Sequence, residues 1–292
     1  MDLSIIIVSY NTSQITKDCI ESALFSLENS KIEYEIIVID NDSSDDSVEQ
    51  LRLLKTKHKQ IQLIESDKNA GFGPANNLGI KKAKGEYILL LNSDTIVLKD
   101  AVEKLLEFAK NNSQAHFVGG KLLNKDMTPQ PSAAPFYSLP VVFAALFLKG
   151  DYWGLTRNSP SKTRKVGWVS GACILAKKAS FEKLGGFDED VFLYMEEVDL
   201  LYRANKLGFN TYFFTDAQFI HIGFASSGNR SKPIIQVFKG FLYLYKKHHS
   251  STSQRLLKFM LQLKADTALL IGKLSHNSYL VKTYEEAKAL IK

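Results

Sequence analysis

Hydrophobic runs and amphipathic stretches alternate along the first part of the chain. Four runs are long and unbroken enough for strands that are buried on both faces of a sheet, at 3–9, 35–40, 61–66 and 86–92. After each of them, apolar residues recur with helical spacing, at 13–27, 45–58, 74–84 and 99–112. This alternation predicts an α/β fold, with a mostly parallel sheet and helices on both of its faces.

The second half of the chain has a less regular pattern. The segment 120–165 contains five prolines and several aromatic residues, which predicts long loops and short helices. A long irregular segment in a compact domain is usually functional. Beyond it we expect a strand and a helix within 166–187, a helix at 193–208, and two short strands at 210–215 and 217–223.

The composition is that of an ordinary globular protein. The 292 residues are 45% hydrophobic and 23% charged, enough for one large domain or two ordinary ones. The two cysteines, Cys19 and Cys173, give neither a disulfide framework nor a zinc-binding spacing. The N-terminal residues lack the features of a signal peptide, and the longest uncharged apolar run, 138–148, is too short to span a bilayer. We therefore expect a cytoplasmic protein.

Positive charge is concentrated near the C-terminus. The net charge is +6, and residues 230–292 hold twelve Lys and Arg against three acidic residues, so this tail carries +9. The asymmetry predicts two domains, 1–225 and 226–292. Leucines, aromatic residues and interleaved lysines in the tail suit an interfacial helix pair on anionic lipid, peripheral on the inner face of the plasma membrane. They equally suit a helical cap or a homodimer contact. No nucleic-acid-binding module accompanies the charge, so we expect no nucleic-acid partner.

Three of the predicted strands end in polar residues, at Ser9-Tyr10-Asn11, Asp40-Asn41-Asp42 and Asn92-Ser93-Asp94. Open α/β sheets bind ligands at the carboxyl ends of their strands. Any one of these ends could be an ordinary turn, but three at one edge of a sheet indicate a ligand site. The glycines after the first strand form neither the dinucleotide-binding motif nor the P-loop motif, which argues against both of those classes.

Five short motifs occur in a fixed order: SIIIVSYN, IIVIDNDSSD, NAGFGPANNLGI, LLLNSDT and YMEEVDLLYR. Together they resemble the family 2 glycosyltransferases of GT-A fold, and within them the bacterial rhamnosyltransferase-like group, over residues 3–225. The resemblance implies a Rossmann-like sheet. It also implies an inverting sugar transfer from a nucleotide-sugar donor, dTDP-rhamnose or a UDP-sugar, to a saccharide or lipid-linked acceptor in bacterial surface polysaccharide biosynthesis.

A divalent cation, Mg²⁺ or Mn²⁺, is the expected cofactor, because a departing diphosphate gains negative charge. Such a cation takes one or two protein carboxylates beside phosphate oxygens and water, and Asp94 at a strand end suits that role. The resemblance makes this the D-x-D site, with Asn92 in its first position. It also implies His221 as a second metal ligand. The alternatives are that Asp94 caps a turn and that His221 is structural.

The donor is expected to lie along the same strand ends. The resemblance places Asp40 at the nucleotide base and Asp42 near the ribose, although a simple Asx-turn would also explain both. The loop that opens the helix at 74–84 can approach the donor closely, or it is only a tight turn. The predicted substrate-binding set is Ser9, Tyr10, Asn11, Asp40, Asp42, Asn69, Gly71, Gly73, Asn76, Asn92, Ser93 and Glu196.

The expected catalytic base is Glu197. Inverting transfer needs a carboxylate that takes the proton of the acceptor hydroxyl, and the resemblance places it at the second position of an E-D pair. The helix dipole alone would also explain two acidic residues, Glu196 and Glu197, in a first turn. Asp199 and Arg203 are spaced as a helix-stabilising pair. Two other functions remain open: a sugar nucleotidylyltransferase, whose basic glycine-rich loop is missing after the first strand, and a non-catalytic nucleotide-sugar-binding protein.

Overall fold

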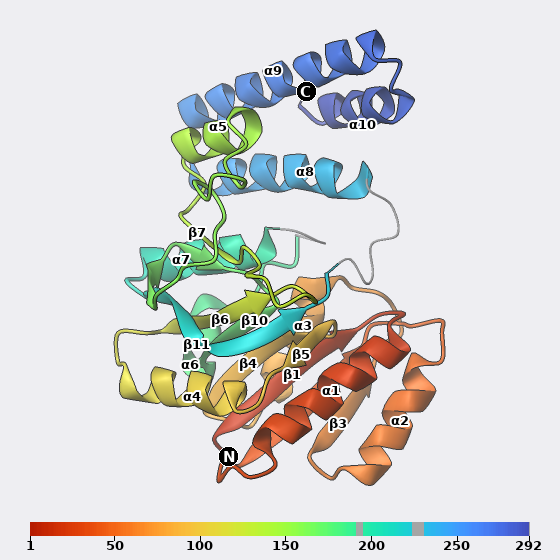
Figure 1. Ribbon diagram of the computed structural model, residues 1–292, viewed down its shortest axis with the longest axis vertical. Helices are drawn as coiled ribbons and strands as arrows, with labels where there is room; N and C mark the ends of the chain where they lie inside the picture. Colours follow the sequence, from red (N-terminus) through yellow and green to blue (C-terminus); the bar gives the residue numbers. More distant parts are fainter. Residues whose placement is uncertain (191–194, 224–230, 292) are drawn as a thin grey trace. The chain divides into compact units, whose positions relative to one another are not determined.

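The computed structural model describes residues 1–190, 195–223 and 231–291 (Figure 1). The chain forms two compact units. The first contains residues 1–134, 158–192 and 196–226, and the second contains 135–157, 193–195 and 227–292. The segment 135–157 therefore packs with the tail helices, and the division into functional domains 1–225 and 226–292 stays a prediction.

A mixed sheet of nine strands forms the centre of the first unit, in the order β3-β2-β1-β4-β10-β6-β11-β5, with β8 paired to β11. Strands β3, β2, β1 and β4 are parallel, as are β6 and β11, whereas β10 runs antiparallel between β4 and β6. The predicted mostly parallel α/β sheet is confirmed. The strands are β1 (Leu3–Ser9), β2 (Tyr34–Asp40), β3 (Ile61–Glu65), β4 (Tyr87–Asn92), β5 (Thr95–Val97), β6 (Phe117–Leu123), β8 (Arg164–Val166), β10 (Cys173–Lys177) and β11 (Thr211–His221). A separate pair joins β7 (Ala133–Ala134) to β9 (Trp168–Val169).

Helices cover both faces of this sheet, which is why β1 is apolar at successive positions. On one face, Ile5 and Ile7 belong to a core that includes Cys19 and Ile20 of the first helix. On the other face, Gly79 belongs to the helix Phe72–Lys82. A Cβ at Gly79 would lie 2.6 Å from Ile6, so this helix packs directly on β1. The helices of this unit are α1 (Ser13–Leu27), α2 (Ser47–Lys57), α3 (Phe72–Lys82), α4 (Ala101–Asn111), α6 (Lys178–Leu184) and α7 (Glu196–Lys206).

Two sequence-based boundaries differ from the structure. The strands expected at 210–215 and 217–223 are one strand, β11, whose pairing with β6 shifts register between Phe214 and Gln218. That irregularity interrupts the hydrophobic alternation, so the sequence indicates a break where the chain has a bulge. The helix expected at 193–208 has its described part at Glu196–Lys206, and residues 191–194 lie outside the described residues.

The second unit consists of helices α5 (Leu139–Phe147), α8 (Ser231–His248), α9 (Ser251–Leu274) and α10 (Ser278–Ala289). Side-chain caps begin two of them: Ser250 accepts a hydrogen bond from the backbone N–H of Ser253, and Asn277 accepts one from Leu280. Among the helices of the described residues, none combines the length and the hydropathy needed to cross a membrane.

Candidate active site

The three polar strand ends lie side by side. In the register of the sheet, Ser9 of β1 is opposite Asp40 of β2, and Val8 of β1 is opposite Asn92 of β4. Neighbouring strands are about 5 Å apart, so the residues that follow β1, β2 and β4 share one edge. The sequence-based expectation of a common edge therefore agrees with the sheet order.

Asp40 is buried, with 1% of its surface exposed, and its two carboxylate oxygens have different surroundings. Oδ2 accepts a hydrogen bond from the backbone N–H of Ser43 at 3.0 Å, which is the Asx-type turn expected as the alternative. Oδ1 is buried and has no hydrogen-bond partner in the described part of the chain. A buried carboxylate oxygen without a partner is costly, so this atom suits a ligand N–H.

Asn11 joins the ends of β1 and β2. Its backbone N–H donates to Oγ of Ser43 at 2.9 Å, and its Oδ1 accepts from the backbone N–H of Ser44 at 2.7 Å. Asn11 and Asp42 adopt positive φ angles of 52° and 67°, in the left-handed region that asparagine and aspartate tolerate. Tyr10 directly follows β1 and is 37% exposed, which leaves its ring open to a ligand.

Asn41, which the sequence analysis did not select, fixes the glycine-containing loop. Its Nδ2 donates to Oδ1 of Asn69 at 2.9 Å, and its Oδ1 accepts from the N–H of Ala70 at 3.1 Å. The same Asn69 oxygen accepts from the N–H of Gly71 at 3.0 Å, and Gly71 has a φ of 91°. Glycine adopts that angle without strain, and the loop then leads directly into α3.

Three predicted binding residues have structural partners instead of an open position. The hydroxyl of Ser9 lies 3.0 Å from Oγ1 of Thr16 in α1. The Nδ2 of Asn76 donates to the carbonyl of Phe72 within α3. A Cβ at Gly73 would lie 3.2 Å from the Cβ of Phe187, so its small size is explained by packing.

Asp94 and His221 meet although they are far apart in the sequence. β5 pairs with β11 through Thr95 and His221, and the N–H of Ile222 donates to the carbonyl of Asp94 at 2.9 Å. As a result, Oδ1 of Asp94 lies 3.3 Å from Nε2 of His221. Asn92 lies beside them, with its Nδ2 3.5 Å from the same Nε2, and Ser93 is partly buried in the connecting turn.

Gln130 determines which nitrogen of His221 carries the proton. Its Nε2 donates to the carbonyl of His221 and to Oδ1 of Asn124, both at 3.0 Å, so its Oε1 is the end that faces the ring. This Oε1 lies 2.7 Å from Nδ1 of His221 and must accept from it. When the ring is neutral, Nε2 therefore carries no hydrogen, and its lone pair points toward Asp94.

This arrangement fits a divalent cation. A carboxylate oxygen and an imidazole lone pair, 3.3 Å apart, are both electron donors and would repel without a proton or cation between them. Oδ1 of Asn92 is also buried with no hydrogen-bond partner within the described residues. Those residues contain no group of three His, Cys, Asp or Glu side chains that could hold a metal. Two protein ligands are nevertheless enough for Mg²⁺ or Mn²⁺ when phosphate oxygens complete its shell.

Glu196 and Glu197 open α7 in different environments. Glu196 is 4% exposed, and its Oε2 has no hydrogen-bond partner among the described residues. Burial, and secondarily the charge of Glu197, raises the pKa of Glu196 to about 8. Glu197 is partly buried and faces Gly171, where an added Cβ would lie 3.7 Å from its own. Burial therefore disfavours a negative charge on Glu196 more than on the less buried Glu197.

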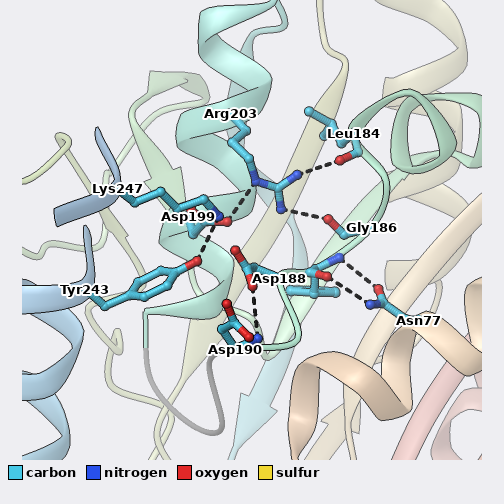
Figure 2. Close-up of polar contacts among 10 residues, drawn as sticks. Asn77, Leu184, Gly186, Asp188, Asp190, Asp199, Arg203, Tyr243 and Lys247 are labelled. Atoms are coloured by element: carbon cyan, nitrogen blue, oxygen red, sulfur yellow. Dashed lines mark hydrogen bonds and ion pairs between the residues drawn. The ribbon is translucent and has the colours of Figure 1, made fainter. Parts of the chain in front are cut away.

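Arg203 holds α7 against the loop that follows α6 (Figure 2). Its Nε donates to Asp199 at 2.8 Å, which confirms the predicted helix pair. Its two terminal nitrogens donate to the carbonyls of Leu184 and Gly186, both at 2.7 Å. Asn77 of α3 also binds this loop (Figure 2). It exchanges two hydrogen bonds with the backbone of Phe187. Through Arg203, these contacts hold α7, the helix that carries Glu197, against the loop that follows α6.

The chain matches the family described as Glycosyl transferase family 2 over residues 4–185, and it belongs to this family. The resemblance inferred from the five motifs is thereby confirmed. A protein of Mycobacterium tuberculosis named N-acetylglucosaminyl-diphospho-decaprenol L-rhamnosyltransferase is 28% identical over 213 residues, 66% of this chain and 68% of that protein. The low-salt glycan biosynthesis hexosyltransferase Agl10 of Haloferax volcanii is 28% identical over 218 residues, 72% of this chain and 63% of that protein. The poly(ribitol-phosphate) beta-glucosyltransferase of Bacillus spizizenii is 37% identical over 123 residues, 42% of this chain and 19% of that protein. The chain is thus a family 2 glycosyltransferase with relatives in polysaccharide and glycan biosynthesis.

Proposed function

We propose that this glycosyltransferase moves a sugar, with inversion, from dTDP-rhamnose or a UDP-sugar to a saccharide or lipid-linked acceptor in bacterial surface polysaccharide biosynthesis. One observation carries the proposal. A buried carboxylate oxygen without a partner, on Asp40, shares a sheet edge with an Asp94–His221 pair that fits a cation. The name of the mycobacterial relative, a rhamnosyltransferase of a diphospho-decaprenol, supports rhamnose and a lipid-linked acceptor.

The donor half of the mechanism uses the ends of β1 and β2. Oδ1 of Asp40 would accept the imide N–H of thymine or uracil, which satisfies its buried oxygen. Asp42, exposed at the next turn, would lie near the ribose. The loop at Asn69–Gly71 and the N-terminus of α3 would face the diphosphate, because backbone N–H groups at a helix start favour anions.

Asp94 and His221 would hold Mg²⁺ or Mn²⁺, with Gln130 keeping the lone pair of His221 Nε2 available. The bound cation would stabilise the negative charge that the diphosphate gains as it departs. Asn92 replaces the carboxylate of the first position in the D-x-D site, and its buried Oδ1 would offer a neutral oxygen of the kind these cations accept.

Glu197 would act as the general base. As the acceptor oxygen forms its bond to the anomeric carbon, Glu197 takes the hydroxyl proton, and the bond to the diphosphate breaks on the opposite face of the sugar. This displacement inverts the anomeric configuration. Burial raises the pKa of Glu196, which would favour the negative charge of the pair on the less buried Glu197, where a base is required.

A thermal-shift screen tests the proposal. Full-length protein is heated with dTDP, UDP, GDP and their sugar conjugates, each with and without Mn²⁺. We expect the largest stabilisation from a thymine or uracil nucleotide with Mn²⁺, because Asp40 matches an imide N–H. Preference for GDP, or shifts that ignore Mn²⁺ for every nucleotide, would contradict it. A wild type that binds a donor and never transfers its sugar would favour a non-catalytic binding protein.

The localisation and assembly predicted from the sequence belong to the same proposal. A cytoplasmic enzyme with a lipid-linked acceptor would work at the inner face of the plasma membrane, where its basic tail would contact anionic lipid. A homodimer formed through the tail is the alternative use of those helices.

A further inference from the structure

Helix α9 of the second unit buries one of its faces. Leu257, Leu261, Ala265, Ala268 and Gly272 are its buried residues. They recur at helical spacing, and α9 contacts α5, α8 and α10. Within this unit, the three partner helices lie on one side of α9 (Figure 1). That packing leaves the opposite side of the helix without a partner in the described residues.

The opposite side of α9 is apolar as well. At about 100° per residue, five large side chains fall within an arc of about 60° that is centred opposite the buried face. These are Leu256, Phe259, Leu263, Leu270 and Leu274, here called the α9 stripe, and they are 45–75% exposed. A monomeric protein rarely leaves such a contiguous apolar surface in water, so the stripe indicates an interface.

The charges around the stripe identify what it meets. Arg255 and Lys273 lie along one edge of the stripe by helical position. Lys264 lies on the packed side of α9 instead, with its Nζ 6.0 Å from the centre of the Phe147 ring of α5. The acidic residue of α9, Asp266, is held by Lys288 at 2.6 Å and by Gln262 at 2.9 Å. The surrounding tail, residues 230–292, has a net charge of +9. A second copy of this chain would bring the same positive charge to the contact, whereas an anionic bilayer complements it.

We infer that α9 lies along the surface of an anionic lipid bilayer, with the α9 stripe in the acyl boundary and Arg255 and Lys273 at the headgroups. An apolar stripe bordered by cations is the pattern of a helix that lies in the membrane interface. This inference rests on the membrane contact proposed above for the basic tail and names the helix and the residues that make it, while requiring neither donor nor acceptor. It would hold the enzyme where a lipid-linked acceptor is presented.

Flotation of the full-length protein with lipid vesicles tests the inference. Wild type is expected to float with vesicles of equal parts phosphatidylcholine and phosphatidylglycerol, and to remain unbound with phosphatidylcholine alone. The double substitution Phe259→Ser and Leu263→Ser should weaken binding at least about tenfold, because two large side chains lose their burial in lipid. Arg255→Glu with Lys273→Glu should weaken it on the order of a hundredfold at low salt and much less at high salt.

A matched control comes from the first unit. Phe25 of α1 is 70% exposed, against 66% for Phe259, so Phe25→Ser removes an equally exposed ring and should leave vesicle binding unchanged. Sedimentation velocity without lipid is run in parallel. Equal flotation of wild type and the stripe variant overturns the inference, as does a wild-type dimer that the stripe variant dissociates. Sugar transfer to a water-soluble acceptor should be unaffected by the stripe substitutions, so failure of the proposed reaction would be seen separately.

Discussion

The two halves of the candidate active site are built in different ways. At the ends of β1 and β2, the polar groups bond to one another through short loops, as Asn11 does with Ser43 and Ser44. In the half that is proposed to hold a cation, Asp94, Gln130 and His221 come from three distant segments. The first half is a rigid frame with one free carboxylate oxygen, on Asp40, whereas the second half depends on long-range contacts. Substitutions should therefore affect ligand selection in the first half and metal affinity in the second.

The largest expected effect comes from Asp94→Ala. Loss of the carboxylate leaves His221 as the one charged or ionisable ligand predicted at this position, so Mn²⁺-dependent binding of UDP or dTDP should fall on the order of a hundredfold or more. Calorimetry with and without Mn²⁺ measures this. Asp100→Ala, which removes an exposed carboxylate paired with Lys104, is the control and should bind as wild type. Full metal dependence in Asp94→Ala would place the cation elsewhere.

Asp40→Asn tests the other half of the comparison. The amide keeps the size of the side chain and can still accept from Ser43, but it offers a donor where the base N–H should bind. Affinity for the preferred nucleotide should drop about tenfold or more while its Mn²⁺ dependence remains. Calorimetry of dTDP, UDP and GDP measures both. An unchanged order of nucleotide affinities would show that Asp40 does not read the base.

Gln130→Ala tests whether Gln130 orients His221 for metal binding without binding the metal itself. Without the acceptor for Nδ1, His221 can place its proton on either nitrogen, and the affinity for Mn²⁺ should fall about tenfold. Gln130→Glu keeps an acceptor at this position and should retain most of the affinity. Electron paramagnetic resonance of free Mn²⁺ in the presence of UDP measures the difference. If both variants bind Mn²⁺ as tightly as wild type and melt at the wild-type temperature, Gln130 does not support the metal site.

Glu196 is expected to affect the pH dependence of stability and not the binding of donor or metal. The pKa of this group rises from about 4.5 in the unfolded chain to about 8 in the folded one. Between these values the unfolded chain releases a proton that the folded chain keeps, so stability falls as pH rises, by at most about 1.4 kcal/mol per pH unit. This contribution is complete below pH 4.5 and lost above pH 8.

Glu196→Gln should remove that slope and make the variant increasingly more stable than wild type toward pH 8. Denaturant unfolding at several pH values measures the free energy. Glu49→Gln, at an exposed carboxylate of α2, is the control and should keep the wild-type slope. The same slope in Glu196→Gln and wild type would contradict a buried, protonated Glu196.

The sheet could be predicted well from sequence because hydrophobic runs and turn residues are local signals. β1 and α1 have the predicted bounds, and the strand ends at Asp40 and Asn92 lie on one edge as expected. The sequence places the start of α3 at 74, because proline favours the first turn of a helix, whereas α3 begins at Phe72 after the positive φ of Gly71.

The rest of the site depends on contacts that no local pattern contains. Gln130 lies in a proline-rich segment and meets His221 across ninety-one positions, so spacing alone could not select it. Asn41 lies at the polar end of β2, between Asp40 and Asp42, which are both predicted to bind the donor. This position is the feature of the sequence that points to a role for Asn41. Ser9 looked like a binding residue because of its place at a strand end, but its side chain faces Thr16 in the core.

The central claim is that Glu197 is the general base of a sugar transfer at this sheet edge, and one measurement tests it most directly. Glu197→Gln keeps the size of the side chain and removes its basic oxygen. Donor affinity by calorimetry should stay within about threefold of wild type, while the rate of sugar transfer to the acceptor falls on the order of a hundredfold or more. Transfer at the wild-type rate in Glu197→Gln, with donor binding intact, would contradict the account.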